Sequence, residues 1–196
     1  MKTYVFGVQL LFLTAGAFVI GAQQPSKEQD LFQQYIEKFG PPGPEHKQLE
    51  SLVGNWRATC KTWKDPGQKP EVSEGTLMRK PIMGGRFLQE DFTGMIAGKS
   101  FQGLGTIGFD RAKQKYVASW IDSMSTAIHI SYGTYDESAK TWTFKQEEVC
   151  PITSKRVKMR DRLQIVNANV QHMEMFRQLG DEKEFRTMEI HLTRQK

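Results

Sequence analysis

The feature that most constrains the fold is a series of about ten short segments of strand-like composition, which starts at Asn55 and runs to Arg194. These segments are rich in β-branched and aromatic residues, and turn residues rather than helical stretches separate them. They span Asn55–Trp63, Ser73–Lys80, Arg86–Thr93, Gly98–Phe109, Lys115–Asp122, Thr126–Tyr135, Lys140–Val149, Lys155–Val166, Val170–Leu179 and Glu184–Arg194. Connections this short favour consecutive hairpins. We therefore predict an all-β fold, an up-and-down antiparallel barrel rather than the alternative sandwich.

The first segment indicates which side chains point into this barrel, because successive residues of a strand alternate between its two faces. Trp56, Ala58 and Cys60 share one face, and the residues between them are polar. In the last segment, Arg194 shares its face with three apolar residues. If the first strand pairs with the last, Trp56 and Arg194 become neighbours, and a guanidinium over an indole contributes about 0.5–2 kcal/mol. Gly54, Trp56 and Arg194 are thus the predicted barrel-closure residues.

A closed barrel of this size can hold one small ligand. Aromatic and methionine side chains suit the apolar part of a ligand, and a carboxylate of Glu90, Asp122, Asp161 or Glu174 can fix a polar end. The alternative is that the inward side chains simply fill the core. The facing of Trp120 and Asp122 stays open, because both faces of their segment carry apolar residues. The predicted ligand-binding residues are Glu90, Phe92, Trp120, Asp122, Trp142, Phe144, Met159 and Glu174.

The N-terminal segment predicts export. Lys2 is followed by an apolar run that ends in the small residues Gly21 and Ala22, which is the layout of a secretory signal peptide. A retained membrane anchor is the alternative, since the run approaches the length of a membrane span. The small-residue exit and the polar Gln23 favour cleavage. We predict a signal peptide over residues 1–22, a periplasmic or secreted protein, and no stable membrane insertion after cleavage.

Residues 23–44 are predicted to form an amphipathic helix followed by a Pro/Gly linker. Ser26 suits the N-cap position, and Gly40 with the proline-rich residues after it ends the helix. The apolar face is expected to dock on the barrel, with a partner or a membrane surface as the alternative. A second short helix follows, so that the barrel domain spans residues 45–196. The apolar residues that recur at helical spacing on the first helix are Leu31, Phe32, Tyr35, Ile36 and Phe39.

The charge pattern argues against a nucleic-acid partner, and the cysteine and histidine pattern argues against a metal site. The formal net charge is +5, and the basic residues are dispersed except between Lys155 and Arg162, where they alternate with apolar residues as on the wet face of a strand. No aromatic stacking platform accompanies them, so we predict no nucleic-acid binding. Cys60 and Cys150 allow either one disulfide or two free thiols. No clustered Cys/His pattern predicts a metal site.

No G-x-S-x-G or HExxH motif is present, and we predict no catalytic residues. One alternative is an enzyme that uses inward carboxylates such as Glu90 and Glu174. Another is an envelope interaction protein that acts through the N-terminal amphipathic helix. Gly103, Gly105 and Gly108 lie in a strand pattern that no helix follows, so they predict bends or bulges rather than a phosphate-binding loop.

Several motifs resemble a known group of barrels. Gly54-x-Trp56, together with Arg194 near the end of the last strand, resembles the lipocalin-like (calycin) superfamily, which includes fatty-acid-binding proteins and nitrobindins. The chain is more closely similar to an uncharacterised bacterial domain-of-unknown-function family of that superfamily. The motifs that carry this second resemblance are Pro44–Trp56, Gly84–Leu88, Phe101–Asp110, Trp120–Met124 and Thr193-Arg194. The resemblance implies a calycin-like barrel with a cavity, in a family whose function is not established.

The resemblance also raises the question of haem, because nitrobindins use a late-strand histidine as an iron ligand. His191 stands at about that place, but it points outward if Leu192 and Arg194 point inward. His129 and His172 are the inward alternatives, and neither carries a haem motif, so we predict no cofactor. We expect an exported lipocalin-like protein that binds a small apolar or amphipathic ligand without catalysis.

Overall fold

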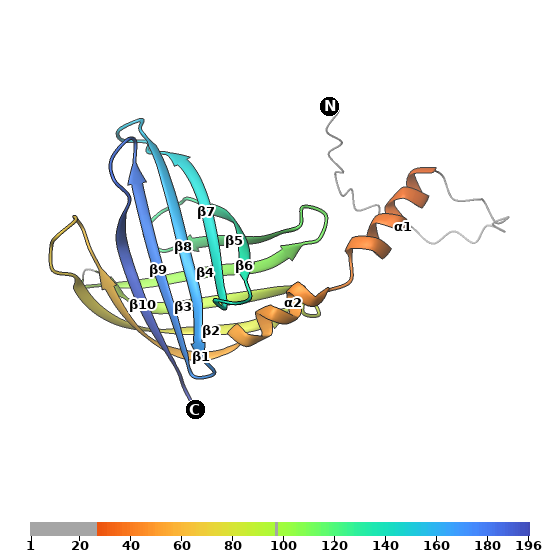
Figure 1. Ribbon diagram of the computed structural model, residues 1–196, viewed down its shortest axis with the longest axis horizontal. Helices are drawn as coiled ribbons and strands as arrows, with labels where there is room; N and C mark the ends of the chain where they lie inside the picture. Colours follow the sequence, from red (N-terminus) through yellow and green to blue (C-terminus); the bar gives the residue numbers. More distant parts are fainter. Residues whose placement is uncertain (1–26, 97) are drawn as a thin grey trace, which may run out of the picture.

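The computed structural model describes residues 27–96 and 98–196, and within them ten antiparallel strands form a closed barrel (Figure 1). Each strand pairs with its neighbours in sequence, and β1 pairs with β10 to close the sheet. The predicted up-and-down barrel is therefore confirmed. The strands are β1 (Gly54–Thr62), β2 (Glu71–Ile82), β3 (Phe87–Ile96), β4 (Lys99–Asp110), β5 (Lys115–Asp122), β6 (His129–Asp136), β7 (Thr141–Val149), β8 (Arg156–Asn167), β9 (Val170–Leu179) and β10 (Phe185–Arg194).

The turn between β2 and β3 sets the register of the two strands. Its backbone is left-handed at three successive residues, with φ of 50° at Met83, 65° at Gly84 and 80° at Gly85. Glycine adopts this conformation without the steric penalty that a Cβ atom brings. With the turn fixed in this way, Arg79 of β2 lies directly opposite Glu90 of β3.

Three glycines of β4 make room for aromatic rings. A Cβ atom on Gly103 would lie 2.1 Å from the Trp120 ring, and one on Gly105 would lie 3.0 Å from the same ring. On the other face, a Cβ on Gly108 would lie 2.6 Å from the ring of Phe87. Bends or bulges were predicted at these glycines; the pairing of β4 with β3 and β5 continues through all three positions, so the structure contains no bulge at them. The glycines instead let large side chains lie flat on the sheet.

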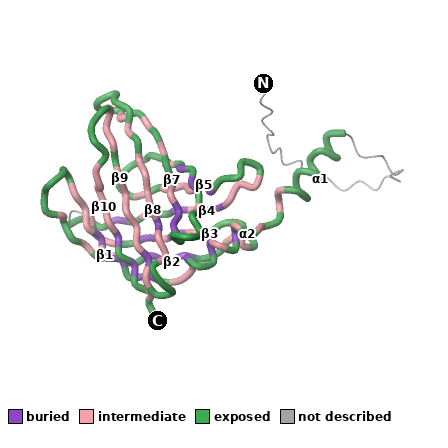
Figure 2. The backbone as a smooth tube through the Cα atoms, in the orientation of Figure 1, coloured by how far each residue is buried: buried purple, intermediate pink, exposed green. Residues whose placement is uncertain are grey.

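A short helical segment closes one end of the barrel. It comprises α2 (Pro44–Leu49) and the 3₁₀ turn η1 (Glu50–Leu52), from which Leu49 and Leu52 are buried against the strands. Figure 2 shows that the buried residues gather in the half of the barrel nearer α2. The hydrophobic cluster beneath α2 comprises Leu49, Leu52, Leu88, Ile107, Tyr116, Trp142, Phe144 and Leu163.

Helix α1 (Lys27–Phe39) extends away from the barrel beyond α2 (Figure 1). It has no buried residue, and its Leu31, Phe32 and Tyr35 side chains are each more than half exposed. The expectation that this apolar face docks on the barrel is therefore wrong. None of the helices in the described residues has the length and apolar character needed to cross a membrane. The signal peptide predicted for residues 1–22 lies outside the described residues.

Candidate ligand-binding cavity

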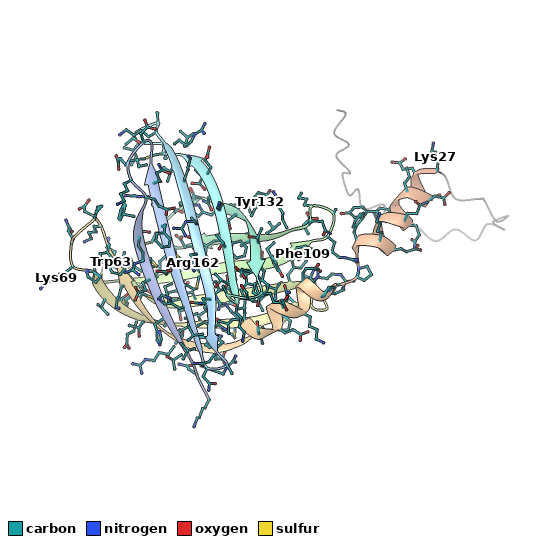
Figure 3. The ribbon with its side chains drawn as sticks, viewed as in Figure 1. Lys27, Trp63, Lys69, Phe109, Tyr132 and Arg162 are labelled. Atoms are coloured by element: carbon teal, nitrogen blue, oxygen red, sulfur yellow. The ribbon has the colours of Figure 1, made fainter. Side chains whose placement is uncertain are left out.

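A cavity of about 510 Å³ occupies the half of the barrel away from α2. Its lining includes Thr62 at the end of β1, Ile96 at the end of β3 and Met124 in the β5–β6 loop. These strand ends lie opposite the end that α2 closes. Figure 3 shows the two ends, with Trp63 beside the β1–β2 loop and Phe109 beside α2. The barrel is thus filled at one end and hollow at the other.

Most of the cavity wall is apolar. Strands β9 and β10 contribute Met173, Met175, Met188 and Ile190, and methionine adapts readily to ligands of different shape. The apolar side chains that complete the wall on the other strands are Cys60, Leu77, Phe92, Ile96, Phe101, Ile107, Ala118, Trp120, Phe144, Met159 and Leu163.

A buried arginine forms the base of the cavity. Arg79 is 1% exposed, and its Nε donates to Glu90 Oε1 at 2.6 Å. A second guanidinium nitrogen donates to Gln171 Oε1, and Gln171 in turn donates to the carbonyl oxygen of Ser51 at 3.3 Å. Burying an unpaired charge is costly, so both members of the Arg79–Glu90 pair depend on each other. This network joins three strands to the 3₁₀ turn η1.

The sequence pattern missed Arg79, although a usable signal was present. The β2–β3 turn sets a register in which an arginine and a glutamate face each other across the hairpin. On β2, however, Leu77 and Arg79 alternate with Thr76 and Met78, so neither face is clearly the apolar one. The charge pair across the hairpin, rather than the hydrophobic pattern, identifies the inner face.

The wall formed by β6, β7 and β8 carries a second group of polar side chains. His129 Nδ1 lies 3.0 Å from Glu148 Oε1 and 3.0 Å from Gln146 Nε2. Asp161 of β8 lies between Phe144 and Met175 of the adjacent strands. Burial raises the pKa of the Asp161 carboxyl to about 6, while Arg160 and His129 act in the opposite direction.

Six of the eight predicted ligand-binding residues line the cavity: Glu90, Phe92, Trp120, Asp122, Phe144 and Met159. The structure settles the facing of two of them, because Trp120 and Asp122 both point inward. The indole Nε1 of Trp120 donates to Asp122 Oδ2 at 3.2 Å, and Asp122 Oδ1 accepts from the backbone N–H of Met124 at 2.9 Å. The Asp122 carboxylate is therefore held by the protein itself.

Trp142 and Glu174 do not line the cavity. Trp142 is on the inner face but is fully buried in the cluster beneath α2. Glu174 is on the outer face, where Arg162 donates to it at 3.2 Å and Arg186 at 3.1 Å. The inward placement of Glu174 is wrong because β9 carries apolar residues on both faces, so that alternation alone selected the wrong one. His172 is on this outer face as well, 3.9 Å from Glu189.

The predicted closure residues meet at the filled end. Trp56 and Arg194 are paired across β1 and β10, and the guanidinium carbon lies 4.2 Å from the indole centroid. The Trp56 Nε1 donates to the carbonyl oxygen of Leu52 at 3.1 Å, and Arg194 donates to that of Val53 at 2.8 Å. At Gly54, φ is +139°, and a Cβ atom would lie 2.2 Å from an Arg194 nitrogen. Only glycine fits there without displacing the arginine.

The two cysteines are free thiols in the structure. Cys60 is buried on the cavity wall, and burial raises the pKa of its thiol to about 11. Cys150 is in the turn after β7, where hydrogen bonds from the Thr153 side chain and backbone lower its pKa. Of the two alternatives that the sequence left open, the structure contains the one without a disulfide.

The three histidines that were considered for haem binding lie on different faces of the barrel. His129 faces the cavity, whereas His172 and the exposed His191 lie on the outer face. Within residues 27–96 and 98–196, no group of three or more His, Cys, Asp or Glu side chains is arranged to hold a metal ion.

Comparison with known proteins identifies a family and a similar fold. Residues 41–194 match the family described as "Protein of unknown function (DUF1579)". No curated protein matches the sequence. The structure is similar to that of Rv2717c from M. tuberculosis, with a TM-score of 0.60 and 16% identity over 80% of this chain and 100% of that one. At this identity the likeness concerns the fold alone.

Two other solved structures give lower scores. A redesigned β-barrel, b11L5F_LGL, has a TM-score of 0.40 and 14% identity, over 76% of this chain and 96% of that one. EF1p2_mFAP2b bound to DFHBI has a TM-score of 0.41 and 12% identity, over 76% of this chain and 98% of that one. The family match, by contrast, covers all ten strands and the segment that closes the barrel. The chain therefore belongs to the DUF1579 family.

Proposed function

We propose that this protein binds a small amphipathic molecule in the hollow end of its barrel and performs no chemistry on it. The observation that carries the proposal is the cavity of about 510 Å³. Ligand sites in proteins typically measure about 300–1,000 Å³ and combine apolar walls with a few polar groups. Both properties are present here, since methionine and aromatic side chains form the wall and Asp161, His129 and Gln146 lie together on one side of it.

Burial of the apolar part of a ligand supplies the affinity. Each Å² of apolar surface removed from water contributes roughly 25 cal/mol, so a hydrocarbon chain lying along the methionine-rich wall gains several kcal/mol. The carboxylates named for an enzymatic alternative are engaged in the protein. Glu90 is paired with Arg79, and Glu174 is on the outer surface. This arrangement supports a binding role over acid–base catalysis.

We also propose that the protein is exported and that it belongs to the calycin-like superfamily. The signal-like residues 1–22 support export, and an exported barrel with one closed and one open end is suited to carrying a poorly soluble compound. The Trp56–Arg194 closure beside Gly54 supports membership of the calycin-like superfamily.

Binding is tested with N-phenylnaphthylamine, a neutral probe whose fluorescence rises in apolar surroundings. Ala118→Trp adds a large ring to the cavity wall, whereas Ile121→Trp adds the same ring to the outer face of the same strand, at a residue that is 43% exposed. Wild type and Ile121→Trp are expected to bind the probe equally, and Ala118→Trp about tenfold more weakly or not at all. Circular dichroism shows whether each variant is folded.

Two outcomes contradict the proposal. One is a folded Ala118→Trp that binds the probe as tightly as wild type, which would place the probe outside the barrel. The other is an absence of probe binding by the wild type. Native mass spectrometry of the protein purified from its own host then reveals whether a small molecule is retained.

A further inference from the structure

The charged groups that face the cavity are mostly neutralised or held by other parts of the protein. Arg79 and Glu90 form an ion pair at the base, with the Arg79 Nε 2.6 Å from the Glu90 carboxylate. The Asp122 carboxylate accepts two hydrogen bonds, one of them from Trp120. His129 is within 3.0 Å of Glu148. Arg177 of β9 also lines the cavity, and its guanidinium lies over the ring of Phe185.

Asp161 is different. It lies on the inner face of β8, with Phe144 and Met175 opposite it on the adjacent strands and Met159 and Leu163 next to it on its own inner face. Within the described parts of the chain, neither a hydrogen bond nor an ion pair contacts its carboxyl group. A carboxylate in such apolar surroundings is costly unless a donor compensates it.

The two arginines that flank Asp161 in sequence are directed away from it. Arg160 forms two hydrogen bonds with Glu184, at 3.0 and 2.6 Å, and its guanidinium lies over the ring of Phe176. Arg162 is 3.2 Å from Glu174 on the outer face. Strand alternation puts both arginines on the face opposite to Asp161, and their hydrogen bonds go to Glu184 and Glu174 rather than to the Asp161 carboxylate.

We infer that the ligand is an amphipathic amine, whose positively charged nitrogen pairs with Asp161 while its apolar part lies along the methionine-rich wall. This inference rests on the proposed function and specifies the class of ligand. A charge-assisted hydrogen bond from an ammonium group supplies the donor that the protein lacks at this position. An anionic head group would be repelled by the Asp161 carboxylate, and the charge of Arg79 is already neutralised by Glu90. The other inward-facing arginine, Arg177, lies over the ring of Phe185.

The experiment compares three competitors that have the same alkyl chain and different head groups. Dodecylamine, dodecanol and dodecanoic acid are each titrated against bound N-phenylnaphthylamine at about pH 8, where the amine is cationic and the Asp161 carboxyl is ionised. Dodecylamine is expected to displace the probe at about tenfold lower concentration than dodecanol, because a hydrogen bond to a charged group contributes at this level. Dodecanoic acid is expected to be the weakest competitor.

Asp161→Asn tests the residue, and Asp91→Asn is the matched control. Asp91 is on the outer face of β3, where Gln89 donates to it at 2.9 Å. Asp161→Asn is expected to remove the preference for the amine over the alcohol while leaving dodecanol unchanged, and Asp91→Asn to keep the preference. If Asp161→Asn does not fold, the ranking of the three competitors on the wild type decides the question.

The outcomes of the competition experiment distinguish a failure of the amine inference from a failure of the proposed ligand binding. If all three compounds displace the probe equally, or dodecanoic acid does so best, the amine inference is wrong and ligand binding stands. If the probe does not bind, or no alkyl compound displaces it, both are wrong. A preference for dodecylamine that survives in Asp161→Asn would also overturn the role of Asp161.

Discussion

At the scale of single residues, the alternation of strand faces is a strong guide only where one face is plainly polar. It placed Trp56 inward because Arg57, Thr59 and Lys61 make the other face of the strand polar. It misplaced Glu174, because Met173, Met175 and Phe176 make both faces of β9 apolar. Arg79 was missed for a related reason. A buried arginine is stabilised by partners from other strands, and a hydrophobic pattern along one strand contains no information about them.

The Asp161 carboxyl makes stability depend on pH in an unusual direction. Its pKa in the folded protein is raised from 3.8 to about 6, so the folded state binds a proton more tightly than the unfolded state does. The resulting stabilisation is fully present below about pH 4 and is lost as the pH rises through about 6. Between these two pH limits, ionisation of Asp161 lowers the free energy of unfolding by about 2–3 kcal/mol.

Asp161→Asn, which resembles the protonated acid, tests this effect in the ligand-free protein. We expect the variant and wild type to have similar free energies of unfolding at about pH 4, and the variant to be more stable by about 2 kcal/mol at about pH 7.5. Urea unfolding at the two pH values gives both numbers. A variant that is less stable than wild type at neutral pH would mean that a protein group stabilises the charged carboxylate.

At the scale of elements, β1, β10 and η1 meet at the Trp56–Arg194 pair. The indole donates to Leu52 of η1, and the arginine reaches both Val53 and Ala168, each at 2.8 Å. The pair therefore fixes the closing strand register and the segment that covers the barrel end at the same time. The sequence predicted the pair because first and last strands of a closed meander must be neighbours.

Trp56→Ala should consequently lower the free energy of unfolding by about 3–5 kcal/mol, the usual loss for a large buried aromatic side chain. Trp63 provides a matched control, because it also lies under an arginine, with Arg186 at 4.7 Å, but is only partly buried. We expect Trp63→Ala to cost about 1 kcal/mol, in line with an exposed cation–π contact. Equal losses in urea unfolding would show that closure does not depend on the buried pair.

Helix α1 illustrates what sequence reasoning can and cannot supply for an element. The regular spacing of Leu31, Phe32, Tyr35 and Ile36 correctly predicted a helix, because that spacing is a local property. Where the helix packs is not local. It depends on whether the barrel offers a complementary apolar surface, and in the described residues the space at the barrel end is already filled by Leu49 and Leu52.

At the scale of the whole molecule, the barrel has a filled half and a hollow half. The sequence predicted which residues face inward better than it predicted whether they fill the space. Trp142 and Phe144 are neighbours on the inner face of β7, yet only Phe144 reaches the cavity. Whether the interior is filled depends on the total volume of the inward side chains of all ten strands and on the leucines that η1 and α2 add at one end. This total cannot be read from the pattern of any single strand.

This division predicts that equivalent truncations in the two halves have opposite consequences. Leu88 is 2% exposed in the filled cluster, so Leu88→Ala should lower the free energy of unfolding by about 2–5 kcal/mol. Met188 borders the cavity and is only partly buried, so Met188→Ala should cost about 1 kcal/mol. Binding should show the reverse order, with N-phenylnaphthylamine affinity unchanged in Leu88→Ala and severalfold weaker in Met188→Ala. Urea unfolding and probe titration on the same two proteins measure both effects. If Met188→Ala proved the more destabilising and left probe affinity unchanged, the side chains around it would be tightly packed, and the hollow half would not be a ligand site.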